Sequence, residues 1–440
     1  MDDLFASDHV DDFGGVEVEA RSSAAPRFDP TRRAKSRPLQ EATVALAKTL
    51  TAKARALGQR RRARTEDEER KFRLAVEALC ANLMASFMRG HEGRLEVPRQ
   101  HGTMSGCYAS EVYGRHFTDI LDLMAHPDVG LIQDEVKGFN VKGGPKQATV
   151  IRALAGLTDA LPLHGACWSD LTQDAEHEEV LLLKGEKGRD GNAEMLPYAE
   201  TKTTTALRNR VRRLNKALLE GDIEVVPNAS GTWDADPTDR MVRRYFNNKS
   251  WQQGGRLFGG FWMPMPRQQR FAIIRLDGQH TVNVDYEQLF PCLAYSRALL
   301  EPPEGDLYDI DGKPEHRKGW KKVFNALLFA RKPLTTWPQE TAHLFPERPS
   351  FKIVRQLLCE RHAPIQGLFE RAVGYHFMHT ESRMLLDALE GMRLKHITAL
   401  PLHDAVLVGE DHGEAAKLAM ENAVQRHAGI TRAMVKIEKS

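Results

Sequence analysis

Two short acidic motifs hold the residues best suited to do chemistry in this chain. Asp285 opens the run 285–290, Asp-Tyr-Glu-Gln-Leu-Phe, and His403-Asp404 interrupts an apolar stretch near the C-terminus. Two carboxylates that converge can hold a pair of divalent cations. Two such ions stabilise both the attacking and the leaving oxygens of an in-line displacement at phosphorus. We therefore predict nucleotidyl transfer at a site built around these two aspartates.

Each aspartate stands where a β-strand is expected to end. Alternating β-branched residues predict a strand over 281–284, directly before Asp285. The apolar runs 400–402 and 405–408 flank His403-Asp404 like the two arms of a hairpin. A purely structural role is the alternative for each motif, because aspartates at strand ends and isolated His-Asp pairs are common in turns. The order of the motifs and the element between them favour the chemical interpretation.

A helix with a cationic stripe is expected between the two aspartates. Pro314 suits its first turn, and Pro333 follows its end. The residues that recur at every fourth position, and so share one face, are Arg317, Lys321, Asn325 and Phe329. Guanidinium and ammonium groups one turn apart can hold the phosphates of an incoming nucleotide and neutralise their charge. The alternative is an ordinary solvated helix face.

In this order, the motifs resemble those of family A, or DNA polymerase I-like, nucleic acid polymerases. Residues 285–295 resemble the first palm motif of that family, Asp-Tyr-Ser-Gln-Ile-Glu-Leu-Arg, two apolar residues and Ala-His. Arg317 and Lys321 match the Arg-x-x-x-Lys of its fingers helix, and residues 403–405 resemble its third motif, His-Asp-Glu. Residues 254–257, Gly-Gly-Arg-Leu, resemble the Thr-Gly-Arg-Leu segment that precedes the palm. The resemblance covers residues 250 to 430.

The resemblance implies a role for each matched residue. Asp285 and Asp404 would bind two Mg²⁺ ions, with the backbone carbonyl of Tyr286 completing the site; Mg²⁺ favours such oxygen ligands and keeps waters and substrate phosphates as the others. The nucleotide-binding residues implied in the same way are Arg317, Lys321, Asn325, Phe290 and Gln288. Arg256 and His403 would lie near the primer end or its backbone.

Four positions depart from the family pattern. Asn325 and Phe329 stand where the family has a base-stacking aromatic and a tyrosine, which predicts weaker base selection. Phe290 replaces the acid that guards the sugar position, and its ring predicts a preference for deoxynucleotides. Ala405 replaces the glutamate of the third motif, so a helper acid is lost while the essential aspartate stays.

A chain of 440 residues is long enough for two or three domains. The predicted fold class is α/β (α+β), a right-hand polymerase with an antiparallel palm sheet, small helical fingers, a helical thumb and an N-terminal region. The expected parts are a disordered acidic and basic tail over 1–38, a helical N-terminal region over 39–190, thumb-like helices over 191–250, and a palm over 251–440 with a fingers insertion at about 300–375.

Charge is distributed unevenly near the N-terminus. Residues 1–20 hold seven acids and no Lys or Arg, which predicts disorder. Residues 31–64 hold eleven Lys or Arg against the single acid Glu41. Such a basic segment attracts phosphate backbones by counterion release, although a charge run is also typical of solvated surface.

Helical periodicity is expected over 39–57, 66–89 and 410–427. A further basic helix is expected over 201–219, where cationic and apolar residues interleave. In a thumb, this helix would grip the duplex backbone, although any amphipathic surface helix has the same spacing. The residues assigned to that contact are Arg208, Arg212 and Arg213.

Other sequence features bound the class of protein. The five cysteines are scattered without a paired spacing for zinc. We find no apolar stretch of about 18 residues and no secretory signal pattern. We therefore expect a soluble, cytoplasmic protein with no membrane partner. No cluster of carboxylates before residue 250 suggests a proofreading exonuclease.

The predicted function is template-directed nucleotidyl transfer by a compact DNA polymerase of the family A type, which adds dNTPs to a primer 3′-hydroxyl on a DNA template. Small relatives of this kind occur in phages and mobile elements, and some are primases, so priming is a further prediction. A helicase or a small accessory protein is the other partner considered. Two alternatives stay open: a single-subunit RNA polymerase or primase that uses NTPs, and a non-catalytic DNA-binding replication factor.

Overall fold

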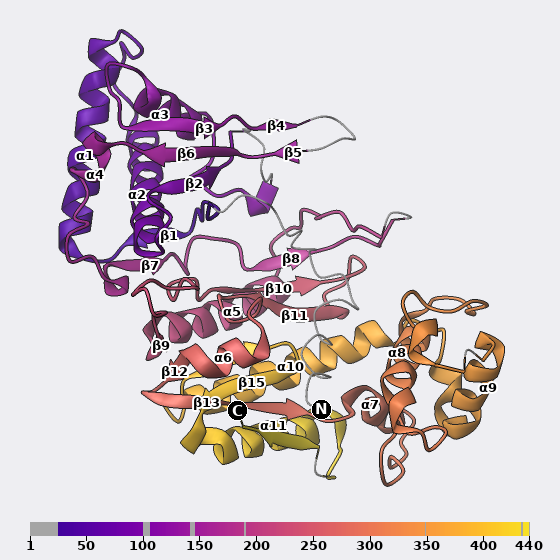
Figure 1. Ribbon diagram of the computed structural model, residues 1–440. Coiled ribbons are helices and arrows are strands. Elements are labelled where there is room, and N and C mark those ends of the chain that lie inside the picture. The colour runs from indigo at the N-terminus through magenta and orange to yellow at the C-terminus, as the bar shows by residue number, and fades with distance from the viewer. Residues whose placement is uncertain are drawn as a thin grey trace. The chain divides into compact units, whose positions relative to one another are not determined.

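The computed structural model describes residues 25–99, 106–140, 146–188, 191–347, 349–432 and 434–439. The chain divides into two compact units that alternate along the sequence (Figure 1). The first unit comprises Met1–Val180, Pro197–Val242 and Gly259–Gln269, and the second comprises Leu181–Leu196, Arg243–Phe258 and Arg270–Ser440. Helices and mainly antiparallel sheets make up both units, in agreement with the predicted α/β class.

Helix α2 (Glu66–Met88) is the most deeply buried helix of the first unit, and α1 (Arg37–Ala56) and α3 (Arg115–Ala125) pack against it. Thr65 and Glu68 close its N-terminus with a capping box, in which each side chain bonds the other residue's backbone N–H. The helices expected over 39–57 and 66–89 are confirmed.

The first unit also contains sheets, where we expected a helical region. The central strand β6 (Thr149–Ala153) pairs in antiparallel fashion with β2 (Arg94–Val97) and β3 (Ile132–Val136). The smaller elements of this unit are β1 (Arg32–Ala34), β4 (Phe139–Asn140), β5 (Lys146–Gln147), α4 (Ala155–Thr158), β7 (Leu171–Gln173), α5 (Lys202–Glu220) and β9 (Ile223–Val225). The expected thumb-like helices over 191–250 correspond to α5 followed by strands.

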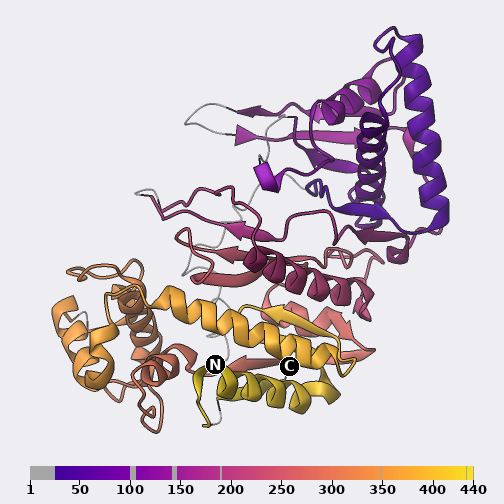
Figure 2. The same cartoon turned by 180° about the vertical axis from the view of Figure 1, so that it is seen from behind.

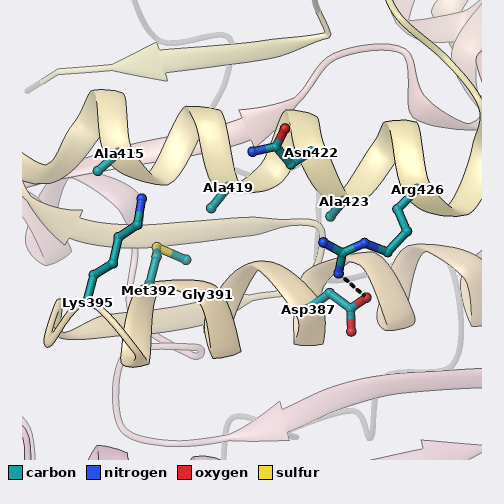
Figure 3. A pocket seen from close by; sticks show the side chains of 9 residues that line it. All are labelled: Asp387, Gly391, Met392, Lys395, Ala415, Ala419, Asn422, Ala423 and Arg426. Atoms are coloured by element: carbon teal, nitrogen blue, oxygen red, sulfur yellow. Dashed lines mark hydrogen bonds and ion pairs between the residues drawn. The ribbon is translucent and has the colours of Figure 1, made fainter.

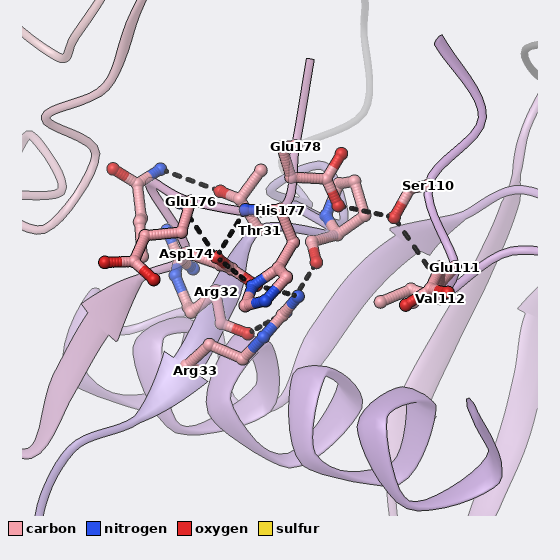
Figure 4. Close-up of polar contacts among 12 residues, drawn as sticks. Thr31, Arg32, Arg33, Ser110, Glu111, Val112, Asp174, Glu176, His177 and Glu178 are labelled. Carbon is pink, nitrogen blue, oxygen red and sulfur yellow. Dashed lines mark hydrogen bonds and ion pairs between the residues drawn. The ribbon is translucent and has the colours of Figure 1, made fainter. Parts of the chain in front are cut away.

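The chain enters the first unit before residue 38, where we expected a tail to end. The seven acids of residues 1–20 lie outside the described residues, but β1 pairs with β7. Two arginines of β1 have acidic partners inside the unit. Arg32 bonds Asp236. Arg33 Nη2 lies 3.3 Å from Asp174 Oδ2, and Figure 4 shows these two side chains. The part of the basic run that forms β1 is therefore ordered, because acidic side chains compensate its charge. The charge pattern of the sequence does not reveal these partners.

The second unit is organised around the strand β13 (Gln279–Tyr286). On one side, β13 pairs with β15 (Ala405–Gly409), and β14 (Ala399–Leu402) continues the sheet. On the other side, it pairs with β12 (Ile274–Leu276) and β16 (Val435–Glu438). All these pairs are antiparallel, so the predicted strand before Asp285 and the predicted hairpin around His403-Asp404 are confirmed.

Two long helices cover this sheet (Figure 2). Helix α11 (Gly413–Ala428) contacts β13, β15 and β16, and α10 (Gly374–Arg393) contacts α11 and β14. Small residues from both helices line a narrow cavity between them, where Asp387 pairs with Arg426 (Figure 3). The helix expected over 410–427 is α11, preceded by a single 3₁₀ turn.

Other elements of the second unit lie around the sheet. The helix with the expected cationic stripe is α8 (Arg317–Phe329), and it contacts α9 (Phe351–Arg361) and α10. A small separate sheet has the order β11-β10-β8, with β10 parallel to β8. Its strands and the remaining helices are β8 (Leu181–Leu183), β10 (Val242–Phe246), β11 (Gly254–Gly259), α6 (Arg267–Ile273) and α7 (Leu289–Arg297).

Close packing of α8 gives a prediction about stability. A Cβ added at Gly319 would lie 2.6 Å from the Cε2 atom of the buried Phe345 ring. Gly319→Ala should therefore lower the free energy of unfolding by about 1–3 kcal/mol, as overpacking typically does. Urea denaturation followed by circular dichroism measures it.

Gly391→Ala in α10 is the matched control, because a Cβ there meets no atom within 4 Å. That change should raise stability by up to about 1 kcal/mol, since alanine favours a helix over glycine. Equal effects of the two substitutions would contradict the packing described for α8.

Candidate active site

The sheet register brings Asp285 and Asp404 to adjacent positions. Asp285 lies opposite Ala405 on the neighbouring strand, and Asp404 directly precedes Ala405 in the turn between β14 and β15. The two residues come from distant parts of the sequence, and it is the β13–β15 pairing that places them side by side. His403, which precedes Asp404, has a φ of +58°, as the tight two-residue turn requires.

The environment of Asp285 disfavours its charge. Burial raises the pKa of the Asp285 carboxyl well above its usual range, and the negative charges of Asp404 and Glu438 raise it further. The ammonium of Lys321 lowers it only in part. The Oδ1 atom of Asp285 is shielded from solvent and has no hydrogen-bond partner among the described residues. A cation at this position would satisfy that oxygen and remove the repulsion.

Tyr286 follows Asp285 at the end of β13 and anchors the strand. Its hydroxyl donates a 3.1 Å hydrogen bond to the Met420 carbonyl of α11, and the ring is buried. Its backbone pairs with Val435 of β16. The strand therefore ends at a position fixed from two sides, and the Tyr286 main chain lies next to the Asp285 carboxylate.

Helix α8 carries Lys321, whose charge acts on Asp285, and Asn325 one turn further along the same face. Asn325, one turn further on, has a buried Oδ1 without a hydrogen-bond partner among the described residues. Trp320 fixes the helix through a 3.0 Å bond from its Nε1 to Asp311 Oδ1. The predicted helix face thus carries the positive charge of Lys321 and, in Asn325 Oδ1, an acceptor without a donor among the described residues.

Arg317, at the start of α8, is already engaged by a carboxylate. Its Nε donates to Asp306 Oδ2, its Nη2 lies 3.4 Å from Asp306 Oδ1, and its guanidinium lies 5.6 Å from the centre of the Tyr308 ring. The two side chains of the pair are 44% and 32% exposed. An exposed pair is weak, so a phosphate group can displace Asp306 at little cost.

Arg256 forms a buried pair that the sequence analysis missed. Its Nε and Nη2 donate to Glu381 Oε1 and Oε2 at 2.6 and 2.8 Å, a bidentate contact. Glu381 lies on α10 and its side chain is 1% exposed. The sequence feature that could have revealed Glu381 is an acid on the apolar face of a helix, between Phe377 and Leu385.

Phe290 and Gln288 have structural contacts in this unit. The Phe290 ring is 6% exposed and lies 5.8 Å from the ring of Phe329 and 6.3 Å from that of Phe377. Gln288 has a φ of +52°, and its Oε1 accepts a 2.6 Å hydrogen bond from the Leu307 backbone N–H. This hydrogen bond connects the turn after β13 to the segment that precedes α8.

The basic residues of α5 belong to the first unit, whereas the residues described above belong to the second. Arg208 is held by Glu200, Glu179 and Tyr198, and these contacts, that of Glu200 foremost, raise the pKa of Arg208. Arg212 is half-buried, and its Nη2 lies 3.5 Å from the Glu178 carbonyl. Arg213 is exposed. The structure therefore leaves Arg213 as the most accessible of the three for a phosphate backbone.

The residues present fit a pair of hard divalent cations held mainly by water and substrate. Within the ranges that the structure describes, no group of three or more His, Cys, Asp or Glu side chains could hold a metal ion. Asp285 and Asp404 therefore make up the candidate carboxylate site, and Mg²⁺ needs no larger protein cage when phosphates supply the other ligands. The unsatisfied Asp285 Oδ1 is the observation that supports this fit.

Comparisons with known proteins give little to set beside this geometry. No family model matches the chain, and no curated protein matches it. Among solved structures, it is similar to the POL domain of Pol1 from M. smegmatis in complex with DNA primer-template and dNTP. That similarity has a TM-score of 0.30 and 11% identity over 93% of this chain and 67% of that one. A likeness this weak carries no argument for fold or function.

No helix in the described parts of the chain has the length and apolar character that crossing a bilayer requires.

The charge repulsion at Asp285 gives a prediction about pH and stability. Because the folded state raises the pKa of Asp285 above its usual 3.8, the folded protein holds a proton that the unfolded chain has released. Proton binding by Asp285 thus stabilises the folded protein most below pH 3.8, and this stabilisation is lost as pH rises above that value. In chelator-containing buffer, Asp285→Asn should be more stable than wild type at pH 8 by at least about 1 kcal/mol, and the difference should vanish below pH 4.

Denaturant unfolding at several pH values measures this difference. Glu304→Gln is the control, because it removes an exposed carboxylate of the same unit. A destabilised Asp285→Asn protein at neutral pH would show that the carboxylate is stabilised by its surroundings, against this description.

Proposed function

We propose that this protein is a nucleotidyltransferase of the family A polymerase type, which extends a primer on a DNA template with nucleoside triphosphates. The observation that carries the proposal is the convergence of Asp285 and Asp404 through strand pairing, with an unsatisfied Asp285 oxygen and Lys321 beside it. A carboxylate whose negative charge is disfavoured by burial and by a neighbouring acid has a clear use when divalent cations bind at the pair.

In this proposal, the sheet of β12 to β16 is the palm and the α8–α9 segment is the fingers. Asp285, Asp404 and the Tyr286 carbonyl hold the cations. Bound Mg²⁺ polarises the phosphate and supplies the charge stabilisation that transfer at phosphorus requires. The carboxylates orient this site because β13 and the β14–β15 turn fix their backbones.

The nucleotide contacts come from α8. Lys321 neutralises phosphate charge beside Asp285, and the Asn325 side chain completes the same face. Arg317 joins them when a phosphate replaces Asp306 as its partner. Phe290 packs against Phe329 and Phe377 at one side of the site, where the Phe290 ring restricts the space for a 2′-hydroxyl.

The primer contacts are assigned to Arg256 and His403. Arg256 keeps one edge of its guanidinium outside the Glu381 pair, and His403 lies next to Asp404 with its ring 5.6 Å from that of Phe258. On α5, Arg213 is the proposed contact to the duplex backbone, with Arg208 and Arg212 supporting the helix. Priming on bare single strands is part of the proposal as a second activity of the same site.

Primer extension tests this function directly. Wild type with Mg²⁺, a labelled primer on a DNA template and dNTPs should extend the primer, and Asp404→Ala should reduce the rate by about a thousandfold or more, because ion binding supplies several kcal/mol of transition-state stabilisation. Glu304→Gln should extend normally.

The substrates decide among the related activities. Extension with NTPs in place of dNTPs would favour the RNA polymerase or primase alternative, and product on an unprimed template would establish priming. If wild type extends nothing with any of these substrates, yet binds DNA, the non-catalytic replication factor replaces the proposal.

The phosphate role of α8 has its own test. Lys321→Ala should lower kcat/KM for the nucleotide by about 10- to 100-fold, since a charge-assisted contact contributes roughly 1.5–3 kcal/mol. Lys322→Ala is the matched control, because Lys322 follows on the same helix but turns to another face. Steady-state extension kinetics compare them, and equal kcat/KM values for the two variants would remove Lys321 from the site.

A further inference from the structure

The buried pair of Arg256 and Glu381 belongs to the same unit as the candidate cation site, and the charge of Asp404 acts on both of its members. Arg256 extends from β11 and Glu381 from α10, and both belong to the second unit. The two contacts of 2.6 and 2.8 Å use both oxygens of Glu381 and two of the three guanidinium nitrogens of Arg256. With side chains 15% and 1% exposed, this pair is shielded from water and the screening of salt.

Neighbouring contacts hold both partners of the pair in place. Ser382, next to Glu381, donates to the Gly255 carbonyl, and Arg244 Nε donates to the same carbonyl at 2.8 Å. The guanidinium of Arg256 also lies 5.9 Å from the centre of the Phe290 ring. The backbone on each side of the pair is thus connected, so the pairing geometry is determined by the fold.

Asp404 is the second acid that acts on Arg256: His403, directly before it, has its ring 5.6 Å from that of Phe258, which lies two residues from Arg256 on β11. Burial opposes the charge of Arg256, but Glu381 and, to a smaller extent, Asp404 outweigh it and raise the pKa of the guanidinium. Asp404 also acts on Glu381. Arg256 therefore has two candidate acidic partners, and the structure shows it paired with Glu381.

A buried arginine that loses its carboxylate partner is expected to pair with another acid, because an unpaired buried charge is strongly destabilising. Without Glu381, Asp404 is the remaining acid whose charge acts on Arg256. A guanidinium paired with Asp404 would occupy oxygens that a divalent cation needs.

We propose that Glu381 is a positioning residue: it neutralises Arg256 and keeps its guanidinium from pairing with Asp404, whose oxygens a divalent cation would use. The inference rests on the proposed function, since it assigns the ligand of Asp404, and it adds a residue that no matched motif contains. Glu381 itself touches neither the cation nor the substrate. Its effect on the reaction passes through Arg256.

Mn²⁺ binding to the full-length protein tests this inference without any need for catalysis. Electron paramagnetic resonance reports free Mn²⁺ during a titration, in the absence of nucleotide and DNA. Wild type should bind Mn²⁺, and Glu381→Gln should bind it at least tenfold more weakly, because Arg256 then pairs with Asp404. The double variant Arg256→Gln with Glu381→Gln removes both charges, and its Mn²⁺ affinity should return to within about threefold of wild type.

Glu390→Gln is the matched control on the same helix. Glu390 also forms a bidentate pair with an arginine, Arg393, at 2.8 and 2.9 Å, but both side chains are more than a third exposed. Its substitution should leave Mn²⁺ affinity unchanged. Circular dichroism and melting curves establish that each variant is folded.

The outcomes separate the inference from the function on which it rests. Absence of Mn²⁺ binding by wild type, with Asp404→Ala indistinguishable from it, would overturn the cation site itself. Wild-type affinity in Glu381→Gln, or an equal loss in the single and double variants, would overturn the positioning role and leave the site standing. If Glu381→Gln does not fold, Glu381→Asp decides: this variant keeps the charge and should keep Mn²⁺ affinity within about threefold, and a tenfold loss in its folded form would refute the inference.

Discussion

The second unit depends on one constraint, the antiparallel pairing of β13 with β15 that holds Asp285 and Asp404 next to each other. Two half-buried carboxylates side by side disfavour each other's charge, and packing elsewhere in the folded protein must outweigh that cost. Val284, Val406 and Leu407 are fully buried in the same strands, and α10 and α11 cover the sheet. The apolar interior therefore stabilises a polar edge that is unfavourable on its own, which is the usual relation between a rigid scaffold and a functional site.

Three cations of the second unit belong to the proposed site, and they differ in how their charge is compensated. Arg256 is locked into a buried bidentate pair with Glu381, whereas Arg317 shares an exposed pair with Asp306. Lys321 acts directly on Asp285. A buried pair persists and positions its members, while an exposed pair exchanges readily with an incoming anion. This difference assigns a fixed role to Arg256 and a movable one to Arg317.

The regular elements near the site were predictable from the sequence. Alternating β-branched residues predicted β13, and the flanking apolar runs predicted the β14–β15 hairpin. Residues that recur at every fourth position, with a proline at each end, predicted α8. The N-terminal half was less predictable. Its sheet of β2, β6 and β3 has short strands of mixed polarity, and the basic residues Arg32 and Arg33 are buried against acids more than a hundred residues away. Local pattern does not encode such partners.

By itself, the sequence determined which residues could do chemistry and which short elements carry them, because periodicity, capping and turn propensity act over a few residues. It marked Asp285, Asp404 and Lys321. Only the tertiary structure decided that Asp285 and Asp404 are neighbours, that Gln288 accepts a hydrogen bond from the Leu307 backbone, and that Glu381 is the partner of Arg256. The reason is physical: strand register, burial and charge compensation are set by contacts between distant segments, and they exist only once the chain has folded.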